Sequence, residues 1–366
     1  MERRIRVCMI VPQSDVKGGI AAVVNGYRGS RLEQDCEVRY VESYCDGGRL
    51  RKFGKALCAY LLFHRELRKH RPDVVHIHSS FGPSFYRKMP FILMSAGAGI
   101  PIVNHIHGSA IEELYERAPG WKQSLVRNIY GKCATIIVLS HEWKERIAQI
   151  VPRERIVIVE NYSVLSVKAP TKESAASKQI LFLGVIEKDK GCFDFPAIME
   201  EVRAEVPQAR LLSAGVGDIH GVQNLLRQRG QEEAVLFPGW IRGQEKDRAL
   251  RESAVFLLPS YHEAMPMSVL EAMGYGLPIV STNVGGIPRL VEEGRNGFLL
   301  APGDTAGMAK ALVCLLNEEE RRERYGKESL RLVREKFGLE EHISRLEKIY
   351  GRVLKQAETE AAKAGE

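Results

Sequence analysis

Several signatures that would place this chain in a common class of protein are missing from its sequence. The seven cysteines are odd in number and none lies in a Cys-x-x-Cys pair, which argues against a disulfide framework and against a zinc or thiol redox site. Reduced thiols in a cytoplasm are the simplest interpretation. Long apolar runs are also missing, because the longest nearly apolar stretch, residues 91–103, is too short and too rich in glycine to span a bilayer.

A secretory leader is not indicated either. The first residues, MERRIRVCMIVP, are basic and then apolar, but the apolar run is short and continues into Gln13, Ser14 and Asp15 with no small-residue cleavage site. We interpret this segment as a first buried strand. The sequence therefore predicts a cytoplasmic protein that is soluble or peripheral to a membrane.

The composition is rich in positive charge. The formal net charge is +7 and the pI is near 9.0. Such a surface favours anionic partners, among them nucleotides, a membrane surface or nucleic acid, although basic surfaces also occur in proteins without such a partner.

Short runs rich in Val, Ile and Leu alternate with longer helical patterns along the whole chain. Strands are predicted at residues 6–11, 37–41, 73–78, 101–105, 135–139 and 156–159, and again at 179–183, 209–213, 235–237, 255–258, 278–281 and 297–300. Continuous apolar strands separated by helices indicate parallel sheets covered on both faces. Each half is therefore predicted to be one doubly wound α/β domain.

Between the two halves lies a segment without apolar periodicity. Residues 163–178, SVLSVKAPTKESAASK, indicate a linker. We expect a first domain at 1–164, a linker at 165–178, a second domain at 179–340, a C-terminal helix at 341–356 that packs back toward the first domain, and a frayed tail at 357–366. The carboxyl ends of both sheets are expected to face a cleft between the domains, because open α/β sheets bind ligands there.

The stretch from Pro259 to Asp304 holds most of the chemical information. It is PSYHEAMPMSVLEAMGYGLPIVSTNVGGIPRLVEEGRNGFLLAPGD. A buried strand is followed by a loop with Glu263, and then by a helix that begins near Pro266 and carries Glu271. Carboxylates accept charge-assisted hydrogen bonds from sugar hydroxyls, and the N–H groups at a helix start bind phosphates. Acidic pairs at this spacing are also common on solvated helices, so the pair by itself leaves both interpretations open.

The ordered stretch as a whole resembles the donor-binding signature of the retaining glycosyltransferases of family 4, which have the GT-B fold. The shared pattern is PS…E, seven residues, EAM…G.P…T..GG.P…G.NG.L…GD. The resemblance implies two Rossmann-like domains facing across a cleft, with the nucleotide sugar bound mainly by the C-terminal half. It also implies that Glu263 approaches the donor sugar, that Glu271 binds the nucleotide ribose, and that the backbone amides of Ala264 and Met265 contact the sugar.

A second segment, LFLGVIEKDKGCFDF, resembles the phosphate-binding loop of the same family. The family usually has an arginine after the glycine at Gly184, and this arginine and a lysine clamp the phosphates. The resemblance places Lys190 at the diphosphate leaving group. The arginine position holds Val185, and Lys188 is the candidate substitute. A further departure is Arg289, which stands where the family commonly has glutamate.

Three residues of the first half also resemble family positions. Gly19 lies in a glycine-rich loop that in the family is near the phosphates and the acceptor, and Asn161 resembles the asparagine that ends the N-terminal domain. His107 resembles the histidine that faces the donor sugar. We therefore predict His107, Glu263 and Lys190 as catalytic residues. The predicted donor-binding residues are Gly19, Gly184, Lys188, Lys190, Glu263, Ala264, Met265 and Glu271.

Four histidines of the first half form two His-x-His pairs, His76/His78 and His105/His107. Alternate residues of a strand share a face, so these imidazoles could suggest zinc. Since no Asp, Glu or Cys completes a recognisable ligand spacing, we expect core or cleft histidines and no metal site. The absence of Asp-x-Asp argues against a metal-dependent GT-A enzyme. No cofactor is expected, because the nucleotide sugar is a substrate.

Three other functions share parts of this pattern. A dehydrogenase is suggested by Gly215 and Gly217 after a strand, but the sixth position of G-x-G-x-x-G is His220. A non-hydrolysing sugar-nucleotide epimerase would have the same fold and donor class but needs no acceptor. A nucleotide-binding module without transferase activity would be favoured by loss of both phosphate-binding cations, and here only the arginine position is lost.

The predicted function is sugar transfer with retention to a saccharide or lipid-linked acceptor hydroxyl, in bacterial cell-surface polysaccharide or glycolipid synthesis, with no nucleic-acid partner. An anionic membrane surface, on the inner membrane face, is a further expected partner. Its signal is the segment Arg49–Arg71, in which basic residues flank an apolar centre at 56–63, and a second basic-aromatic patch at 85–88. A helix whose apolar side faces the core would show the same pattern.

Overall fold

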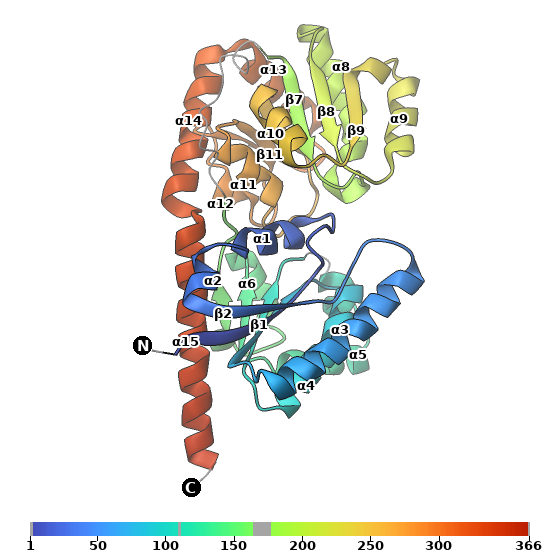
Figure 1. The fold of residues 1–366 in the computed structure, drawn as a ribbon. Coiled ribbons are helices and arrows are strands. Elements are labelled where there is room, and N and C mark those ends of the chain that lie inside the picture. The colour runs from blue at the N-terminus through green and yellow to red at the C-terminus, as the bar shows by residue number, and fades with distance from the viewer. Residues whose placement is uncertain (1–2, 109–110, 164–176, 365–366) are drawn as a thin grey trace. The chain divides into compact units, whose positions relative to one another are not determined.

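The computed structural model describes residues 3–108, 111–163 and 177–364, and in it the chain forms two compact units (Figure 1). The first unit comprises Met1–Asn161 and Leu339–Glu366, and the second comprises Tyr162–Gly338. Each has one six-stranded sheet and its own buried apolar core.

The sheet of the first unit has the strand order β2-β1-β3-β4-β5-β6, and all neighbouring strands are parallel. Its strands are β1 (Ile5–Val11), β2 (Cys36–Glu42), β3 (Val74–Ser79), β4 (Ile102–Ile106), β5 (Thr135–Val138) and β6 (Ile156–Ile158). Its helices are α1 (Gly19–Tyr27), α2 (Arg31–Asp35), α3 (Arg49–Lys69), α4 (Pro83–Gly97), the π-helix η1 (Glu112–Glu116), α5 (Gly120–Tyr130) and α6 (His141–Ile147). The strand order reverses between β1 and β3, which is where doubly wound sheets leave room for a ligand.

The sheet of the second unit has the order β12-β11-β10-β7-β8-β9, again with parallel neighbours. Its strands are β7 (Gln179–Leu183), β8 (Arg210–Ala214), β9 (Val235–Gly239), β10 (Val255–Leu258), β11 (Ile279–Thr282) and β12 (Gly297–Leu300). Its helices are η3 (Lys188–Lys190), η4 (Cys192–Asp194), α8 (Phe195–Glu205), α9 (Ile219–Gln228), α10 (Gly243–Glu252), α11 (Met267–Gly274), α12 (Ile287–Leu290), α13 (Thr305–Asn317) and α14 (Glu319–Lys336). Here the order reverses between β7 and β10.

All twelve strands predicted from the sequence are present, and the predicted α/β fold class is confirmed. The inner strands are easy to recognise because helices cover both faces of each sheet, so most of their residues are buried. In β10, for example, all four residues are buried. The edge strands β2, β6, β9 and β12 are only partly buried.

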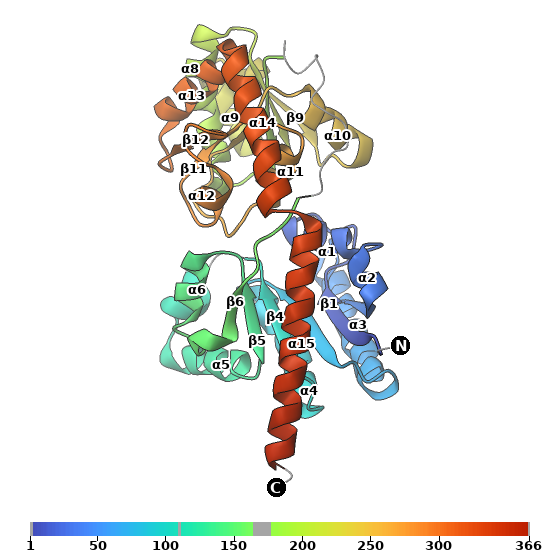
Figure 2. The same cartoon turned by 90° about the vertical axis from the view of Figure 1, so that its left-hand side faces the viewer.

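The long helix α15 (Leu339–Ala364) ends the described chain and belongs to the first unit (Figure 2). Within that unit the hydroxyl of Tyr350 lies 2.7 Å from His76 Nδ1 on β3. The frayed tail predicted at 357–366 is wrong as far as Ala364, because this segment is helical. Alanine and glutamate make up most of residues 357–364, and both are strong helix formers.

The linker predicted at 165–178 lies mostly outside the described residues. Ser163, just before it, already belongs to the second unit, since its N–H donates to Phe337 O at 2.8 Å and its hydroxyl donates to Leu270 O at 2.8 Å. Lys178, just after it, donates to Leu316 O. Among the helices that the structure describes, none is long and apolar enough to cross a membrane.

Candidate functional site

The candidate site of the second unit is built by the loops that follow β7, β10 and β11, three neighbouring strands. The loop after β10 is joined to the loop after β7 by a hydrogen bond from Tyr261 N–H to Asp189 O, 2.8 Å long. The order of the sheet reverses between β7 and β10, so these two loops flank the position where doubly wound sheets bind ligands.

Two glycines allow these loops to approach closely. Gly191 has φ +69°, and a Cβ there would lie 2.0 Å from Pro259 O. Gly285 has φ +56°, and a Cβ there would lie 1.7 Å from Glu263 O. Only glycine fits such positions. The loops after β7 and β11 therefore pack directly against the loop after β10, and this packing fixes the position of the Glu263 backbone.

Lys190 and Glu263 form an ion pair across the two loops. Lys190 Nζ lies 2.6 Å from Glu263 Oε1, and the Ser260 hydroxyl donates to the same oxygen at 2.9 Å. The Glu263 side chain is 8% exposed and the Lys190 side chain 25% exposed. The carboxylate is therefore held in place by two donors, while the lysine side chain remains partly exposed.

Glu271 lies in a separate ion pair on helix α11. Lys246 of α10 donates to Glu271 Oε1 at 2.8 Å, and both side chains are partly exposed. Pro266 is the N-cap residue of α11, whose first turn has no side-chain cap and no acidic residue. Uncapped N–H groups at a helix start favour an anion. The side chains of Ala264 and Met265, just before this helix, are buried.

The two lysines of the loop after β7 differ in their contacts. Lys188 is exposed, and its Nζ lies 5.6 Å from the centre of the Phe193 ring, whereas Lys190 contacts Glu263. Val185 is half-buried, and its carbonyl accepts a hydrogen bond from Cys192 Sγ at 3.7 Å. The structure thus brings Lys190, but not Lys188, into contact with the predicted glutamate.

Two further carboxyl groups of this region have shifted pKa values. Burial raises the pKa of Glu187, although the Lys190 charge counteracts the shift. Burial also raises the pKa of Asp194, although a hydrogen bond from the Tyr261 hydroxyl, 2.9 Å long, counteracts that shift. Both shifts favour the uncharged acid and so reduce the repulsion of an anionic ligand as the pH falls.

Gly215 and Gly217, which suggested a dinucleotide-binding loop, have a packing role instead. A Cβ at Gly215 would lie 1.8 Å from Gly184 O, and a Cβ at Gly217 would lie 2.2 Å from Ile186 O. These glycines let the loop after β8 pack against the loop after β7. Their spacing is therefore explained without a dinucleotide.

The remaining predicted residues lie in the first unit. His107 follows β4, is half-buried, and has Nε2 2.9 Å from His78 Nδ1. Burial lowers the pKa of His107 to about 3, so the imidazole is neutral at physiological pH. Gly19 begins α1, whose N-cap Gly18 has φ +145° and provides no side-chain cap. Asn161 is the last residue of the first segment of this unit and is buried.

Two residues of the site were not found from the sequence. Ser260 is the serine of the PS motif, and its position three residues before Glu263 could have suggested the hydrogen bond. Lys246 lies 25 residues before Glu271, on another helix, and no local pattern indicates that the two side chains meet.

Each of the two units matches a separate model of a known protein family. Residues 177–318 match the family model described as "Glycosyl transferases group 1", and residues 19–162 match the model described as "Glycosyltransferase Family 4". The N-acetyl-alpha-D-glucosaminyl L-malate synthase of Bacillus anthracis is 27% identical over 294 residues, which cover 77% of this chain and 75% of that protein.

Two solved structures have the same fold at low sequence identity. The sucrose-phosphate synthase of Thermosynechococcus elongatus superposes with a TM-score of 0.81 at 15% identity, covering 96% of this chain and all of that one. HepE of Anabaena, solved in complex with UDP and glucose, superposes with a TM-score of 0.73 at 16% identity, covering 95% of this chain and all of that one.

Proposed function

The chain belongs to the family 4 glycosyltransferases, and from this premise we propose that it moves a sugar, with retention, from a nucleoside-diphosphate sugar to an acceptor hydroxyl. The observation that carries the proposal is the Lys190–Glu263 pair, held where the second sheet reverses its strand order. A partly exposed cation beside a fixed carboxylate suits a ligand that has both a diphosphate and sugar hydroxyls. HepE, which has the same fold, binds UDP and glucose.

In the proposed reaction the bond between the anomeric carbon and the diphosphate breaks first, leaving an oxocarbenium-like centre. The acceptor hydroxyl enters on the same face, and the leaving phosphate takes its proton. Lys190 and the uncapped start of α11 stabilise the departing negative charge. Glu263 and His107 position the donor sugar, Glu271 binds the ribose, and Gly19, Gly184, Ala264 and Met265 contribute backbone contacts. The proposed reaction needs no metal.

Glu271 provides the sharpest test of the donor site. Removing a charge-assisted hydrogen bond costs about 1.5–3 kcal/mol, so Glu271→Ala should weaken UDP binding roughly 10- to 150-fold in calorimetry. Glu201→Ala, which removes an exposed glutamate from α8, is the matched control and should bind UDP as the wild type does. If UDP does not bind the wild type, the other nucleoside diphosphates are screened by thermal shift. Unchanged nucleotide affinity in a folded Glu271→Ala protein would contradict the ribose assignment.

Product analysis separates transfer from epimerisation. We expect mass spectrometry to detect a glycosylated acceptor and free nucleoside diphosphate in equal amounts. Conversion of the nucleotide sugar to its epimer without an acceptor would instead support the epimerase alternative.

We further propose that the enzyme docks peripherally on an anionic membrane to reach an acceptor of cell-surface polysaccharide or glycolipid synthesis. Helix α3 carries five exposed large apolar side chains, and Leu50, Phe53 and Leu61 are 89%, 72% and 67% exposed. The other two are Leu57 and Leu62. The core contacts of α3 are made mainly by Ala59 and Phe63, which are buried. An apolar stripe that faces solvent is typical of helices that insert into the membrane interface.

The neighbouring helix α4 extends this surface. The Tyr60 hydroxyl of α3 donates to Arg87 O at 2.9 Å, and α4 adds the exposed side chains Tyr86 and Leu93. The predicted patch at 85–88 is wrong in part, because Phe85 and Lys88 are buried. The Lys88 ammonium donates to Ile10 O and to the Ser43 hydroxyl, and it cannot reach a membrane.

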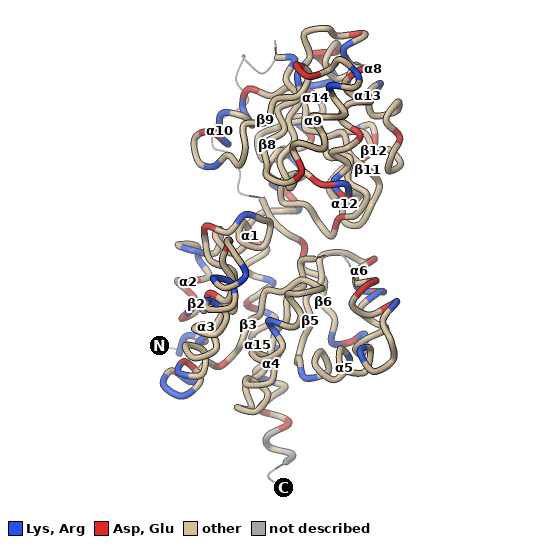
Figure 3. The backbone as a smooth tube through the Cα atoms, turned by 90° about the vertical axis from the view of Figure 1, so that its right-hand side faces the viewer, with Lys and Arg blue, Asp and Glu red and all other residues tan. Residues whose placement is uncertain are grey.

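Basic residues at both ends of α3 supply the charge complementarity (Figure 3). Arg49, Arg51 and Lys52 surround Leu50 in the first turn of α3, and Arg65, Arg68 and Lys69 follow the apolar stripe. Each basic residue near an anionic leaflet contributes about 1 kcal/mol. Lys55 contributes less, because it is paired with Glu42 at 2.9 Å.

Liposome flotation tests this surface. We expect binding to vesicles that contain anionic lipid, weakened by salt, and lost in Arg49→Glu/Arg51→Glu/Lys52→Glu and in Phe53→Ser/Leu57→Ser. The matched control, Lys310→Glu/Arg324→Glu/Lys327→Glu, reverses three exposed charges of the second unit and should still float. Absence of flotation at low salt, or self-association that the α3 variants abolish, would contradict membrane docking.

A further inference from the structure

A layer of buried imidazoles lies between the sheet of the first unit and helix α15. His76 and His78 of β3 and His105 of β4 are all fully buried. His78 and His105 are direct partners in the parallel pairing of β3 with β4, and His76 lies two residues earlier on β3, so the three share one face of the sheet. Their ring centres lie 4.3–5.6 Å apart.

The hydrogen bonds of this layer leave several ring nitrogens without a partner. His76 Nδ1 lies 2.7 Å from the Tyr350 hydroxyl, and His78 Nδ1 lies 2.9 Å from His107 Nε2. The buried Nε2 atoms of His76 and His78, and both nitrogens of His105, have no hydrogen-bond partner among the described residues. Each such buried polar atom costs about 1–3 kcal/mol. A ligand that accepts their lone pairs would remove much of this cost.

We propose that His76, His78 and His105 bind one late-transition metal ion, with Zn²⁺ as the probe ion. One ligand atom from each of the three lies within 4.8 Å of the others. Coordination at about 2.0–2.1 Å draws these nitrogens closer together. Neutral imidazole is a preferred ligand of zinc, copper and nickel, and all three rings are buried in a layer that favours the neutral form.

The neighbours of the layer support this ligand set. When His76 Nδ1–H donates to the Tyr350 hydroxyl, the lone pair of His76 Nε2 is free to bind the metal. When His78 Nδ1–H donates to His107 Nε2, the lone pair of His78 Nε2 is likewise free to bind the metal. Such outer hydrogen bonds fix the tautomer and the orientation of metal-binding histidines. Among the described residues no carboxylate or thiolate joins the three histidines at this spacing, so the fourth ligand is supplied by solvent.

A fourth histidine of the layer, His342 of α15, is excluded from the ligand set. Its Nε2 lies 2.7 Å from the Tyr27 hydroxyl and its Nδ1 lies 2.8 Å from Glu160 O. Both of its nitrogens are therefore used. The metal would link the central strands β3 and β4 on the face that α15 covers. Its binding can be measured without any sugar transfer.

The experiment measures bound metal in the full-length chain without a histidine tag. The protein is treated with chelator, reconstituted with Zn²⁺ and freed of excess metal. Elemental mass spectrometry then measures the number of zinc ions per chain. We expect one zinc ion per chain in the wild type and almost none in His105→Phe, which keeps an aromatic ring but has no nitrogen. His141→Phe, which removes an exposed histidine at the start of α6, is the matched control and should keep one zinc.

A second variant tests the outer hydrogen bond. Tyr350→Phe removes the acceptor of His76 Nδ1–H and should weaken zinc binding about 10- to 100-fold in competition with a chromophoric chelator. Wild-type protein that stays folded and holds far less than one zinc per chain would overturn the proposal, and so would full zinc in folded His105→Phe. If His105→Phe does not fold, X-ray absorption of the wild type decides, because it must show imidazole nitrogens around the zinc.

Discussion

Lys190 and Glu263 form an ion pair, and this pairing has a consequence for the proposed catalysis. The Lys190 ammonium must interact with the diphosphate in the proposed reaction, while Glu263 remains anchored by Ser260. Lys190 is the more exposed partner, so it is the one that can turn toward a ligand. The pair therefore places a cation at the site before the donor arrives.

Lys190→Ala should lower turnover about 100-fold or more, because removal of one group that stabilises developing negative charge has an effect of this size. Lys188→Ala, the matched control from the same loop, should have a small effect, since Lys188 lies over Phe193. Steady-state kinetics with a saturating acceptor measures both. Full activity of Lys190→Ala, or a larger loss in Lys188→Ala, would show that the phosphate-binding cation is not Lys190.

The close approach of the loops after β7 and β10 depends on a single glycine, Gly191. The fit of this glycine determines which substitutions the loop tolerates. Gly191 and Gly294 have nearly the same positive φ, +69° and +72°. A Cβ at Gly191 would meet Pro259 O at 2.0 Å, whereas a Cβ at Gly294 would have no neighbour within 4 Å. The two positions therefore separate backbone strain from steric overlap.

Gly294→Ala should lower the free energy of unfolding by only about 1–2 kcal/mol, which is the cost of the left-handed conformation for a residue with a Cβ. Gly191→Ala should cost more and should also weaken UDP binding, because the loops after β7 and β10 must separate. Chemical denaturation and calorimetry measure the two effects. Equal destabilisation of the two variants, with UDP affinity unchanged in both, would contradict the steric explanation.

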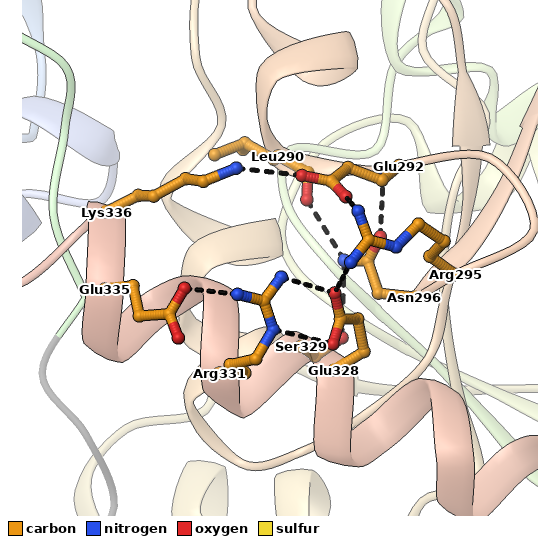
Figure 4. A network of polar contacts seen from close by, with 9 residues as sticks. All are labelled: Leu290, Glu292, Arg295, Asn296, Glu328, Ser329, Arg331, Glu335 and Lys336. Atoms are coloured by element: carbon orange, nitrogen blue, oxygen red, sulfur yellow. Dashed lines mark hydrogen bonds and ion pairs between the residues drawn. The ribbon is translucent and has the colours of Figure 1, made fainter.

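Helix α14 is tied to the segment between α12 and β12 by a network of polar contacts (Figure 4). Glu328 of α14 accepts a hydrogen bond from Arg331 at 2.6 Å and one from Arg295 at 2.7 Å. Lys336 lies 2.9 Å from Glu292. The Arg331 hydrogen bond lowers the pKa of Glu328, although partial burial counteracts the shift.

The pKa of Glu328 is lower in the folded chain than in the unfolded chain. The charged Glu328 carboxylate therefore stabilises the fold at neutral pH, and this stabilisation is lost as the pH falls through the folded pKa. Glu328→Gln should reduce the free energy of unfolding at pH 7 by roughly 0.5–1.5 kcal/mol, as expected for two exposed ion pairs. Glu320→Gln, the matched control on the same helix, should have little effect. Denaturation at several pH values measures the difference, which should disappear in acid. A difference that persists below the folded pKa of Glu328, where the carboxylate is protonated in both states, would mean that the network acts through packing.

The whole chain consists of two units that each bury their own apolar core, and this predicts separable unfolding. Scanning calorimetry should show two transitions. A nucleoside diphosphate at about 100 times its Kd should stabilise the second unit by about 2.7 kcal/mol, because a ligand stabilises the state it binds. Zinc should shift only the transition of the first unit. Hydrogen exchange assigns each transition, and a nucleotide effect confined to the first unit would contradict the donor assignment.

Much of the architecture was determined by the sequence alone. Most inner strands are largely apolar because helices cover both faces of the sheet, and this pattern is visible in the local sequence. All twelve strands were therefore located within a few residues. The loop position of Glu263 and the helix position of Glu271 were also predictable, since Pro266 marks the start of α11. The family resemblance identified Lys190, and the structure places it against Glu263.

Only the tertiary structure decided which surfaces and side chains meet. The pattern of α3 suits a core-facing helix and a membrane-facing one equally, and the packing of Ala59 and Phe63 inward is what leaves Leu61 in solvent. Lys88 is part of a basic run in the sequence but is buried in the fold. His76 meets Tyr350 across 274 residues of chain. Such contacts depend on how distant elements pack, and no local composition or periodicity contains that information.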